Sequence, residues 1–92
     1  MPRYLIYTTH TPEECVETLD SYLHAGAHYL THADWGCEDG AHAEWLIVEA
    51  QNDADARLMV PPVVRNAAQV VRLSRYTPEQ IRALHQEPGP PV

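Results

Sequence analysis

The residues with the greatest chemical capacity are concentrated in one stretch, residues 26–50. It holds three of the six histidines, both tryptophans and one of the two cysteines. Imidazole and carboxylate groups are ligands for zinc, nickel, copper or iron. A histidine also acts as a general base near neutral pH, and a tryptophan can wall an aromatic pocket. The stretch therefore indicates a metal site, a ligand pocket or acid–base chemistry.

Two strands joined by a turn are expected to carry these residues. Residues 28–35 and 42–50 are predicted to be the strands. Gly36 and Gly40 bracket the turn between them, and Asp39-Gly40 is a favourable turn dipeptide. The two strands should therefore pair as an antiparallel hairpin.

The register of this hairpin decides which side chains meet. Side chains alternate across a strand, so pairing Asp34 with His42 would place His32 opposite Glu44, with His28 on the same face. A register shifted by one residue would put the two sets on opposite faces of the sheet. Both registers are compatible with the sequence.

In the first register, a metal site is predicted from His28, His32, His42 and Asp34, with zinc or nickel as the cofactor. Three protein ligands with an open position suit catalysis, and four form a closed site. Cys37 in the turn could add a thiolate. If the chemistry is acid–base catalysis instead, His28 and His32 are the candidates for the general base.

A ligand pocket is the second prediction, with Trp35 and Trp45 as its walls and Glu44 as its polar group. The plainer alternative is that the tryptophans belong to the core or a dimer interface, and that the histidines are exposed or hydrogen-bonded strand residues. Sequence patterns alone are compatible with both.

The two cysteines are expected to be reduced thiols, and the first histidine is expected to have a local structural role. Cys15 and Cys37 lie 22 residues apart without a CxxC pair, so no cysteine zinc site is indicated. Cys37 has acidic neighbours in sequence, which disfavour a thiolate nucleophile. His10 stands just before a helix cap, where a local structural role is expected.

Composition limits the partners. The net charge is −7, with six arginines and no lysine, which argues against binding to nucleic acid or to an anionic membrane. No run approaches the ~20 apolar residues needed to span a bilayer, and the first residues do not resemble a signal peptide. We therefore expect a cytoplasmic protein with reduced cysteines.

The remaining elements follow from propensity and capping signals. Thr11-Pro12-Glu13-Glu14 is a capping box with proline at the first helical position, and Thr77-Pro78-Glu79-Gln80 repeats this signal. Asn52 or Asp53 should cap another helix, which Pro61-Pro62 ends. The expected elements are a strand at 3–9, a helix at 12–24, a helix after 52, a strand at 69–76 and a short helix after 77.

The predicted order is β-α-β-β-α-β with a short C-terminal helix. This is a ferredoxin-like α+β fold with a four-stranded antiparallel sheet and helices on one face. It should form one domain at 1–86, followed by a flexible proline-rich tail at 87–92.

Over residues 3–76 the chain resembles small bacterial proteins of the dimeric α/β-barrel superfamily. These include muconolactone-isomerase-like proteins, small heme-degrading or quinol-type monooxygenases and small nickel-binding domains. The resemblance rests on the element order, the strand at 29–35, the acidic Glu38-Asp39 turn and the strand ending in Val48-Glu49-Ala50 before a helix. It implies that a second subunit covers the open sheet face and leaves a cavity between the two.

Three functions follow from these patterns. The leading hypothesis is a homodimer that binds a metal ion or small ligand on the histidine-bearing sheet face. The second is a small isomerase or cofactor-light monooxygenase with a histidine base. The third is a structural or interaction domain without chemistry.

Overall fold

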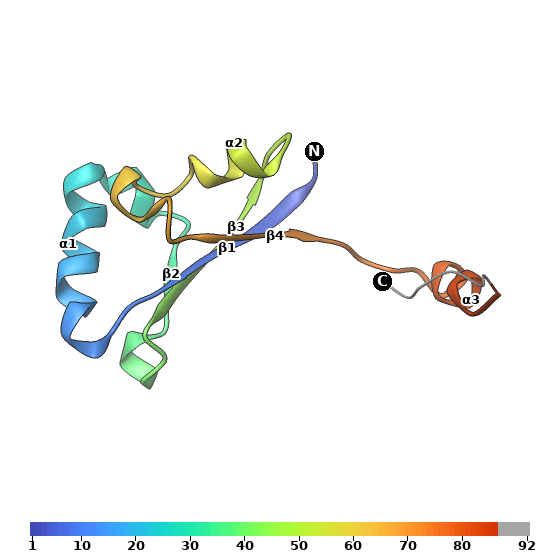
Figure 1. The fold of residues 1–92 in the computed structure, drawn as a ribbon, viewed down its shortest axis with the longest axis horizontal. Coiled ribbons are helices and arrows are strands. Elements are labelled where there is room, and N and C mark those ends of the chain that lie inside the picture. The colour runs from blue at the N-terminus through green and yellow to red at the C-terminus, as the bar shows by residue number, and fades with distance from the viewer. Residues whose placement is uncertain (87–92) are drawn as a thin grey trace.

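The computed structural model describes residues 1–86 and confirms the α+β class. One antiparallel sheet has the strand order β2-β3-β1-β4 (Figure 1). Its strands are β1 (Arg3–Thr9), β2 (Asp34–Trp35), β3 (Ala43–Glu49) and β4 (Gln69–Leu73). The α-helices in the described part of the chain are α1 (Cys15–Ala25), α2 (Asp53–Arg57) and α3 (Pro78–Gln86). The tail predicted at 87–92 lies outside the described residues.

Alternation along the two central strands defines the buried face of the sheet. Tyr4 pairs with Val48 and Ile6 pairs with Leu46, and all four side chains are buried. The hydrophobic core on this face also includes residues of α2 and of the segments around it, namely Ala50, Ala56, Val60 and Ala68. Burial of this apolar surface is the main driving force that holds the sheet to α2.

The first helix begins where the capping signal predicts and turns an unexpected side inward. Thr11 and Glu14 form the capping box, which leads through η1 (Pro12–Glu14) into α1. Tyr22 is the buried residue of α1, whereas the apolar stripe of Val16 and Leu23 is 68% and 56% exposed. The tyrosine side of α1 therefore faces the sheet, for a reason found in the site described below.

The strand predicted at 28–35 is wrong over most of its length. Gly26 ends α1 with φ +143°, and its carbonyl oxygen accepts a hydrogen bond from the Tyr29 amide in η2 (Ala27–Leu30). The His28 ring lies against the Tyr29 ring, with 4.2 Å between centroids. This local turn overrides the strand propensity of the segment, so only Asp34 and Trp35 join the sheet.

Of the two registers that the sequence left open, the one that pairs Asp34 with His42 does not form. Asp34 pairs with Trp45, and Trp35 pairs with Glu44. The glycine-bracketed turn is confirmed, with η3 (Cys37–Asp39) between the glycines. It extends to His42, because the Gly36 amide donates to the Ala43 carbonyl oxygen. Asp34 and Glu44 therefore lie on opposite faces of the sheet.

Two arginines donate hydrogen bonds to backbone carbonyl groups near Pro61 and Pro62, where the chain changes direction. Asn52 caps α2 as predicted, and the helix ends before Pro61, so the predicted proline stop is confirmed. Arg57 Nη1 donates to the carbonyl oxygens of Arg65 and Ala68, at 2.8 and 2.6 Å. Arg65 Nε in turn donates to the Val60 carbonyl oxygen at 2.8 Å. These bonds satisfy carbonyl groups that form no regular ladder.

The last strand is shorter than the predicted 69–76. Leu73 pairs with Arg3, the first residue of β1, so the chain beyond it has no strand beside it. The predicted terminal helix is present as α3, which stands apart from the rest of the molecule (Figure 1). Within residues 1–86, no helix has the length and apolar character required to cross a membrane.

The arginine contacts give a prediction about stability. Replacing Arg57 by methionine keeps much of the apolar stem and removes the donors for two carbonyl groups, so the free energy of unfolding should fall by about 1–3 kcal/mol. Arg82→Met is the control, since the bond that Arg82 makes within residues 1–86 is to Glu79 on the surface, and it should cost no more than about 0.5 kcal/mol. Urea denaturation measures both, and equal effects would contradict the role of Arg57.

Candidate metal centre

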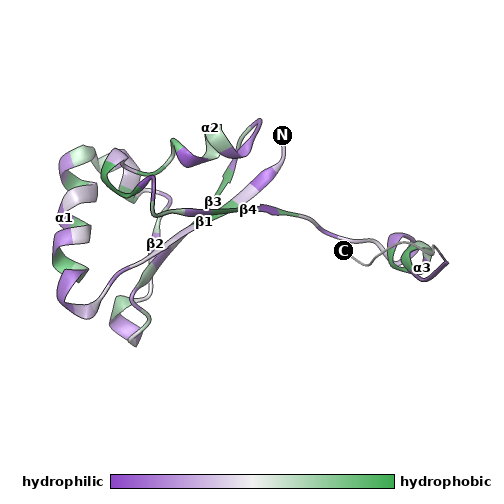
Figure 2. Ribbon diagram, viewed as in Figure 1, coloured by the Kyte–Doolittle hydropathy of each residue, from purple (hydrophilic) through white to green (hydrophobic). Residues whose placement is uncertain are grey.

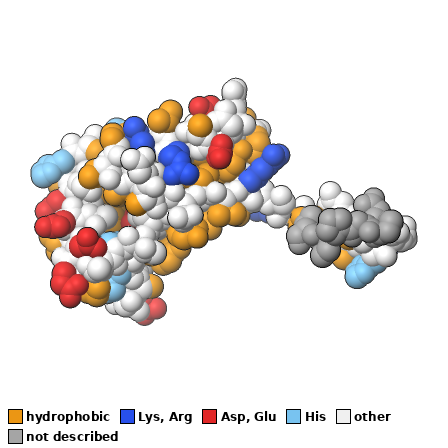
Figure 3. All heavy atoms as spheres, viewed as in Figure 1, with side chains coloured by type: hydrophobic (Ala, Val, Ile, Leu, Met, Phe, Trp, Pro, Cys, Tyr) orange, Lys and Arg blue, Asp and Glu red, His pale blue; other side chains and the backbone are white. Residues whose placement is uncertain are grey.

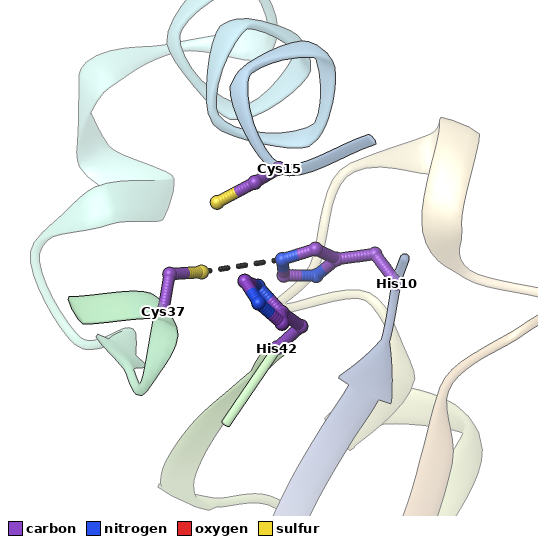
Figure 4. Close-up of side chains that lie close together, drawn as sticks. All are labelled: His10, Cys15, Cys37 and His42. Atoms are coloured by element: carbon purple, nitrogen blue, oxygen red, sulfur yellow. Dashed lines mark hydrogen bonds between the residues drawn. The ribbon is translucent and has the colours of Figure 1, made fainter. Parts of the chain in front are cut away.

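Four side chains suited to metal binding meet at one end of the sheet. They are His10, Cys15, Cys37 and His42, and one ligand atom of each lies within 4.8 Å of the others. Figure 4 shows the four side chains pointing toward one another from separate parts of the chain. Within residues 1–86, they form the one group of such residues with metal-binding separations.

The two histidines are positioned by the sheet. His10 follows β1 and His42 precedes β3, one residue beyond the last pair of that ladder, Thr9 and Ala43. The His10 amide donates to the His42 carbonyl oxygen at 3.0 Å, which extends the strand pairing to the histidines. Neighbouring residues of paired strands hold their side chains close together, so β1 and β3 bring both imidazoles to one end.

The two cysteines are positioned by turns. The Thr11 capping box reverses the chain after β1 and starts α1 at Cys15. Cys37 follows Gly36, where a side chain would have no room: a Cβ there would lie 2.6 Å from the Ala41 carbonyl oxygen and 2.8 Å from the Trp45 ring. The close approach of these segments requires glycine and directs Cys37 toward the histidines.

One pair within the cluster is already in contact. His10 Nε2 lies 3.2 Å from Cys37 Sγ. The pKa of the Cys37 thiol is raised to about 11, first by a hydrogen bond with the Cys15 side chain and then by burial. Both cysteines are free thiols. A metal ion would replace the protons that these groups now share.

A buried carboxylate supports the cluster from behind. The Glu44 side chain is fully buried, and its Oε1 accepts hydrogen bonds from the hydroxyl groups of Thr8 and, at 2.7 Å, Tyr22. Burial and the bond to Glu44 raise the pKa of Tyr22 above its ordinary value. The other oxygen, Oε2, lies 3.9 Å from Nδ1 of His10, whose side chain is 4% exposed. Glu44 thus connects β1, α1 and the first candidate ligand.

Three polar atoms around the cluster are buried without a hydrogen-bond partner: His10 Nδ1, His42 Nδ1 and Glu44 Oε2. Buried polar groups without a partner are rare, and each calls for an explanation. Zinc-bound histidines commonly donate their second ring nitrogen to a carboxylate, which fixes the tautomer. Metal binding at His10 Nε2 would place the proton on Nδ1, facing Glu44 Oε2, and would explain two of the three atoms.

The donor set and its dimensions fit a tetrahedral ion. With Zn–S near 2.3 Å and Zn–N near 2.0–2.1 Å, the ligand atoms of a tetrahedral zinc site lie about 3.3–3.8 Å apart. The four groups, within 4.8 Å of one another, need to close by no more than about 1.5 Å to reach that geometry. Cys15, Cys37 and His42 are half-buried, so a small inward movement of their side chains is enough to close these distances.

The predicted metal ligands are only partly brought together. His42 and Cys37 belong to the cluster, whereas His28 and His32 line a separate cavity of about 100 Å³ with Tyr29, Leu46 and Met59. Asp34 is exposed at the sheet edge. The shared face predicted for these residues does not form, because η2, which carries His28, and the turn after it, which carries His32, replace the expected strand.

The predicted ligand-pocket residues are also divided. Trp35 lies beside Tyr22, with 5.0 Å between ring centroids, and beside His10 at 6.0 Å. Glu44, its strand partner, belongs to the carboxylate network. Trp45 pairs with Tyr7 and therefore lies on the opposite face of the sheet. The two tryptophans do not wall one pocket.

His10 and Cys15 are candidate ligands that the sequence patterns did not predict. The spacing of the cysteines indicated no zinc site, yet both cysteines lie in the cluster. One signal for them exists in the sequence. His10 stands five residues before Cys15, and Cys37 stands five residues before His42, so each pair encloses one turn. This mirrored spacing differs from the usual zinc patterns, and only the sheet shows that the two pairs meet.

Comparison with known proteins adds no assignment: no family, curated protein or solved structure matches this chain. The function of this chain is therefore inferred from the geometry of the site.

The carboxylate network gives a second prediction. Tyr22→Phe keeps the ring and removes a hydroxyl donor from buried Glu44, so the free energy of unfolding should fall by about 1–3 kcal/mol. Tyr76→Phe is the control, because Tyr76 is 48% exposed, and its effect should be under about 0.5 kcal/mol. Thermal and urea unfolding both report the difference, and a neutral Tyr22→Phe would show that the network adds no stability.

Proposed function

We propose that this protein binds one zinc ion through His10, Cys15, Cys37 and His42. The observation that carries the proposal is the convergence of two thiols and two imidazoles from three separate parts of the chain. The orphaned nitrogens of both histidines support it. In a metal-bound imidazole, one ring nitrogen binds the ion and the other donates a hydrogen bond, so both nitrogens have a role.

Zinc is favoured over nickel by the chemistry of the donors. Two thiolates and two imidazoles in a tetrahedral arrangement are typical of zinc, whereas nickel(II) prefers square-planar or tetragonal nitrogen and oxygen ligands. Four protein ligands fill the coordination sphere and leave no position for a substrate. The site is therefore proposed as a structural one.

A structural metal ion would connect parts of this chain that few other contacts hold together. The strand β2 contributes only two residues to the sheet, and α1 turns its apolar stripe to solvent. A domain of this size buries a modest core, and small domains often depend on a metal ion. An ion held by all four residues would connect the end of β1, the start of α1 and the β2–β3 turn. The binding free energy would then add to the folding free energy.

The fold and its setting are also proposed. We assign a ferredoxin-like arrangement because the chain has the β-α-β-β-α-β order and its strands form an antiparallel sheet of order β2-β3-β1-β4. Membership of the dimeric α/β-barrel superfamily and a homodimer through the open sheet face remain predictions. A cytoplasmic location would keep Cys15 and Cys37 reduced, as thiolate ligation requires.

One observation favours an enzyme as the second candidate. Cys37 Sγ, the His10 ring and Glu44 Oε2 follow one another at 3.2 and 3.9 Å, the order of nucleophile, base and orienting acid in cysteine hydrolases. The raised pKa of Cys37 opposes this function, since the attacking species is the thiolate. Cys15 and His42 would also have no role in it. The metal site accounts for all four residues.

Zinc should stabilise the protein strongly and through these ligands alone. At a free zinc concentration about 1,000 times Kd, the gain is about 4 kcal/mol, which corresponds to at least about 15 °C in Tm for a domain of this size. His42→Ala and Cys15→Ser should remove most of that increase. Differential scanning calorimetry of protein purified without an affinity tag, with zinc and with a chelator, measures it.

The matched controls are His28→Ala and His32→Ala, which alter the imidazoles first predicted as ligands and should leave the zinc response unchanged. Native mass spectrometry should show one zinc per chain in the wild type and in both controls. A response lost in the controls and kept in His42→Ala would overturn the proposed site in favour of the cavity lined by His28 and His32.

The affinity for zinc should depend steeply on pH. Each cysteine that binds as a thiolate releases a proton, and the raised pKa of Cys37 keeps its proton in place at neutral pH. Raising the pH therefore strengthens binding, by about 100-fold in Kd per pH unit when two thiol protons are displaced. Competition with a coloured chelator between pH 6 and 8 measures the slope, and a Kd independent of pH in this range would contradict thiolate ligation.

A further inference from the structure

The face of the sheet opposite α2 has an apolar centre and lacks a covering element within residues 1–86. Alternation places six large hydrophobic side chains on it: Leu5, Tyr7, Trp45, Ile47, Val71 and Leu73. Leu5 lies at its centre, paired with Ile47 on one side and Val71 on the other, and these two are 57% and 43% exposed. Figure 3 shows hydrophobic side chains gathered along the strands on the side away from α2. Exposed apolar patches of this kind are typical of interaction surfaces.

The terminal helix α3 presents a second apolar surface, and the described part of the chain offers it no partner. All nine of its residues are exposed. Ile81 and Leu84 share one side at helical spacing and are 47% and 39% exposed. Figure 2 shows both hydrophobic and hydrophilic residues along α3, as in a helix with one face for packing.

The helix has defined ends and too little length to stand alone. Thr77 and Gln80 form a capping box, in which the Thr77 amide donates to Gln80 Oε1 and the Gln80 amide donates to Thr77 Oγ1. Isolated helices shorter than about 12–15 residues are marginal in water. A capped amphipathic helix of nine residues therefore requires a surface to pack on.

The shape of the chain shows that its own body does not provide that surface. The radius of gyration is 16.5 Å, whereas a compact chain of this length has about 12 Å. Residues 74–77 are exposed and carry the chain away from β4, so that α3 projects from the body (Figure 1). The proline at 78 favours an extended conformation for the residue before it, which keeps this connection straight.

We propose that α3 is an exchanged arm: it packs on the open sheet face of a second copy of the chain, and the second copy's α3 packs on the first. The dimensions agree. Nine residues make a helix about 13–14 Å long, and the four strands span about 14 Å from first to last. A two-fold exchange covers the apolar side of α3 and the apolar sheet face in both chains. It is closed, because no arm and no face is left unpaired for further assembly.

The exchange is independent of the zinc site, because Tyr22 and Glu44, which support that site, belong to the opposite face of the sheet. It also specifies more than a sheet-to-sheet dimer, since the contact is between an arm and a face. Those two surfaces can be altered separately.

Sedimentation equilibrium of the full chain tests the proposal. Two variants disrupt one surface each: Ile81→Gln with Leu84→Gln on the arm, and Ile47→Gln with Val71→Gln on the face. Glutamine has a helix propensity close to that of leucine, so the arm remains helical. The wild type should be dimeric at micromolar concentration, and each double variant alone should raise the dimer Kd by at least about 100-fold.

Mixing the two variants separates exchange from other dimers. The intact arm of the face variant can pack on the intact face of the arm variant, so the mixture should recover dimers that neither variant forms alone. Two matched controls should dimerise as the wild type does: Glu79→Gln with Ala83→Gln on the other side of α3, and Val16→Gln with Leu23→Gln on α1. These controls alter exposed positions outside the proposed contact.

Four results would overturn the exchange. The first is a monomeric wild type, which would mean that α3 folds back on its own body or packs on nothing. The second is an arm variant that dimerises as the wild type does, which would indicate direct packing of two sheet faces. A mixture that stays monomeric is the third, and a dimer lost in the α1 control is the fourth.

Discussion

The buried carboxylate of Glu44 is the constraint on which this arrangement depends. A fully buried carboxylate is costly unless hydrogen bonds compensate for the lost water. Its partners come from Thr8 on β1 and Tyr22 on α1. The need to satisfy this group therefore fixes the rotation of α1, with Tyr22 inward and the Val16 side outward. The same rotation brings Cys15 to the ends of β1 and β3, where His10 and His42 already lie side by side.

Two groups of side chains lack binding partners within residues 1–86, and the two proposals supply a partner for each group. Three buried polar atoms lack partners around the cysteine–histidine cluster, and a metal ion bound to His10 would account for two of them, His10 Nδ1 and Glu44 Oε2. The apolar sheet face and the apolar side of α3 lack partners elsewhere, and a second copy would cover both. Metal binding and dimerisation would both stabilise a chain of 92 residues, whose own core is small. They act at separate places, so they contribute independently to the stability of the domain.

Local signals in the sequence predicted most elements, and tertiary contacts decided the rest. The capping boxes at Thr11 and Thr77 located two helices, because they depend on neighbouring residues alone. The strand at 28–35 failed, because the turn after Gly26 outweighs its β propensity. The cysteine–histidine cluster was missed because it depends on the β1–β3 pairing and on the rotation of α1, and spacing within a short stretch of sequence carries no information about either. His42 and Cys37 were recognised by residue type, with other partners expected.

X-ray absorption at the zinc edge tests the central claim most directly. The protein should be purified without an affinity tag and loaded with one equivalent of zinc. The account predicts four first-neighbour atoms, two sulfurs at about 2.3 Å and two nitrogens at about 2.0–2.1 Å, with the outer-shell scattering of two imidazoles. A first shell of oxygen and nitrogen alone, without sulfur, would show that the cysteines do not bind the ion and would contradict the account.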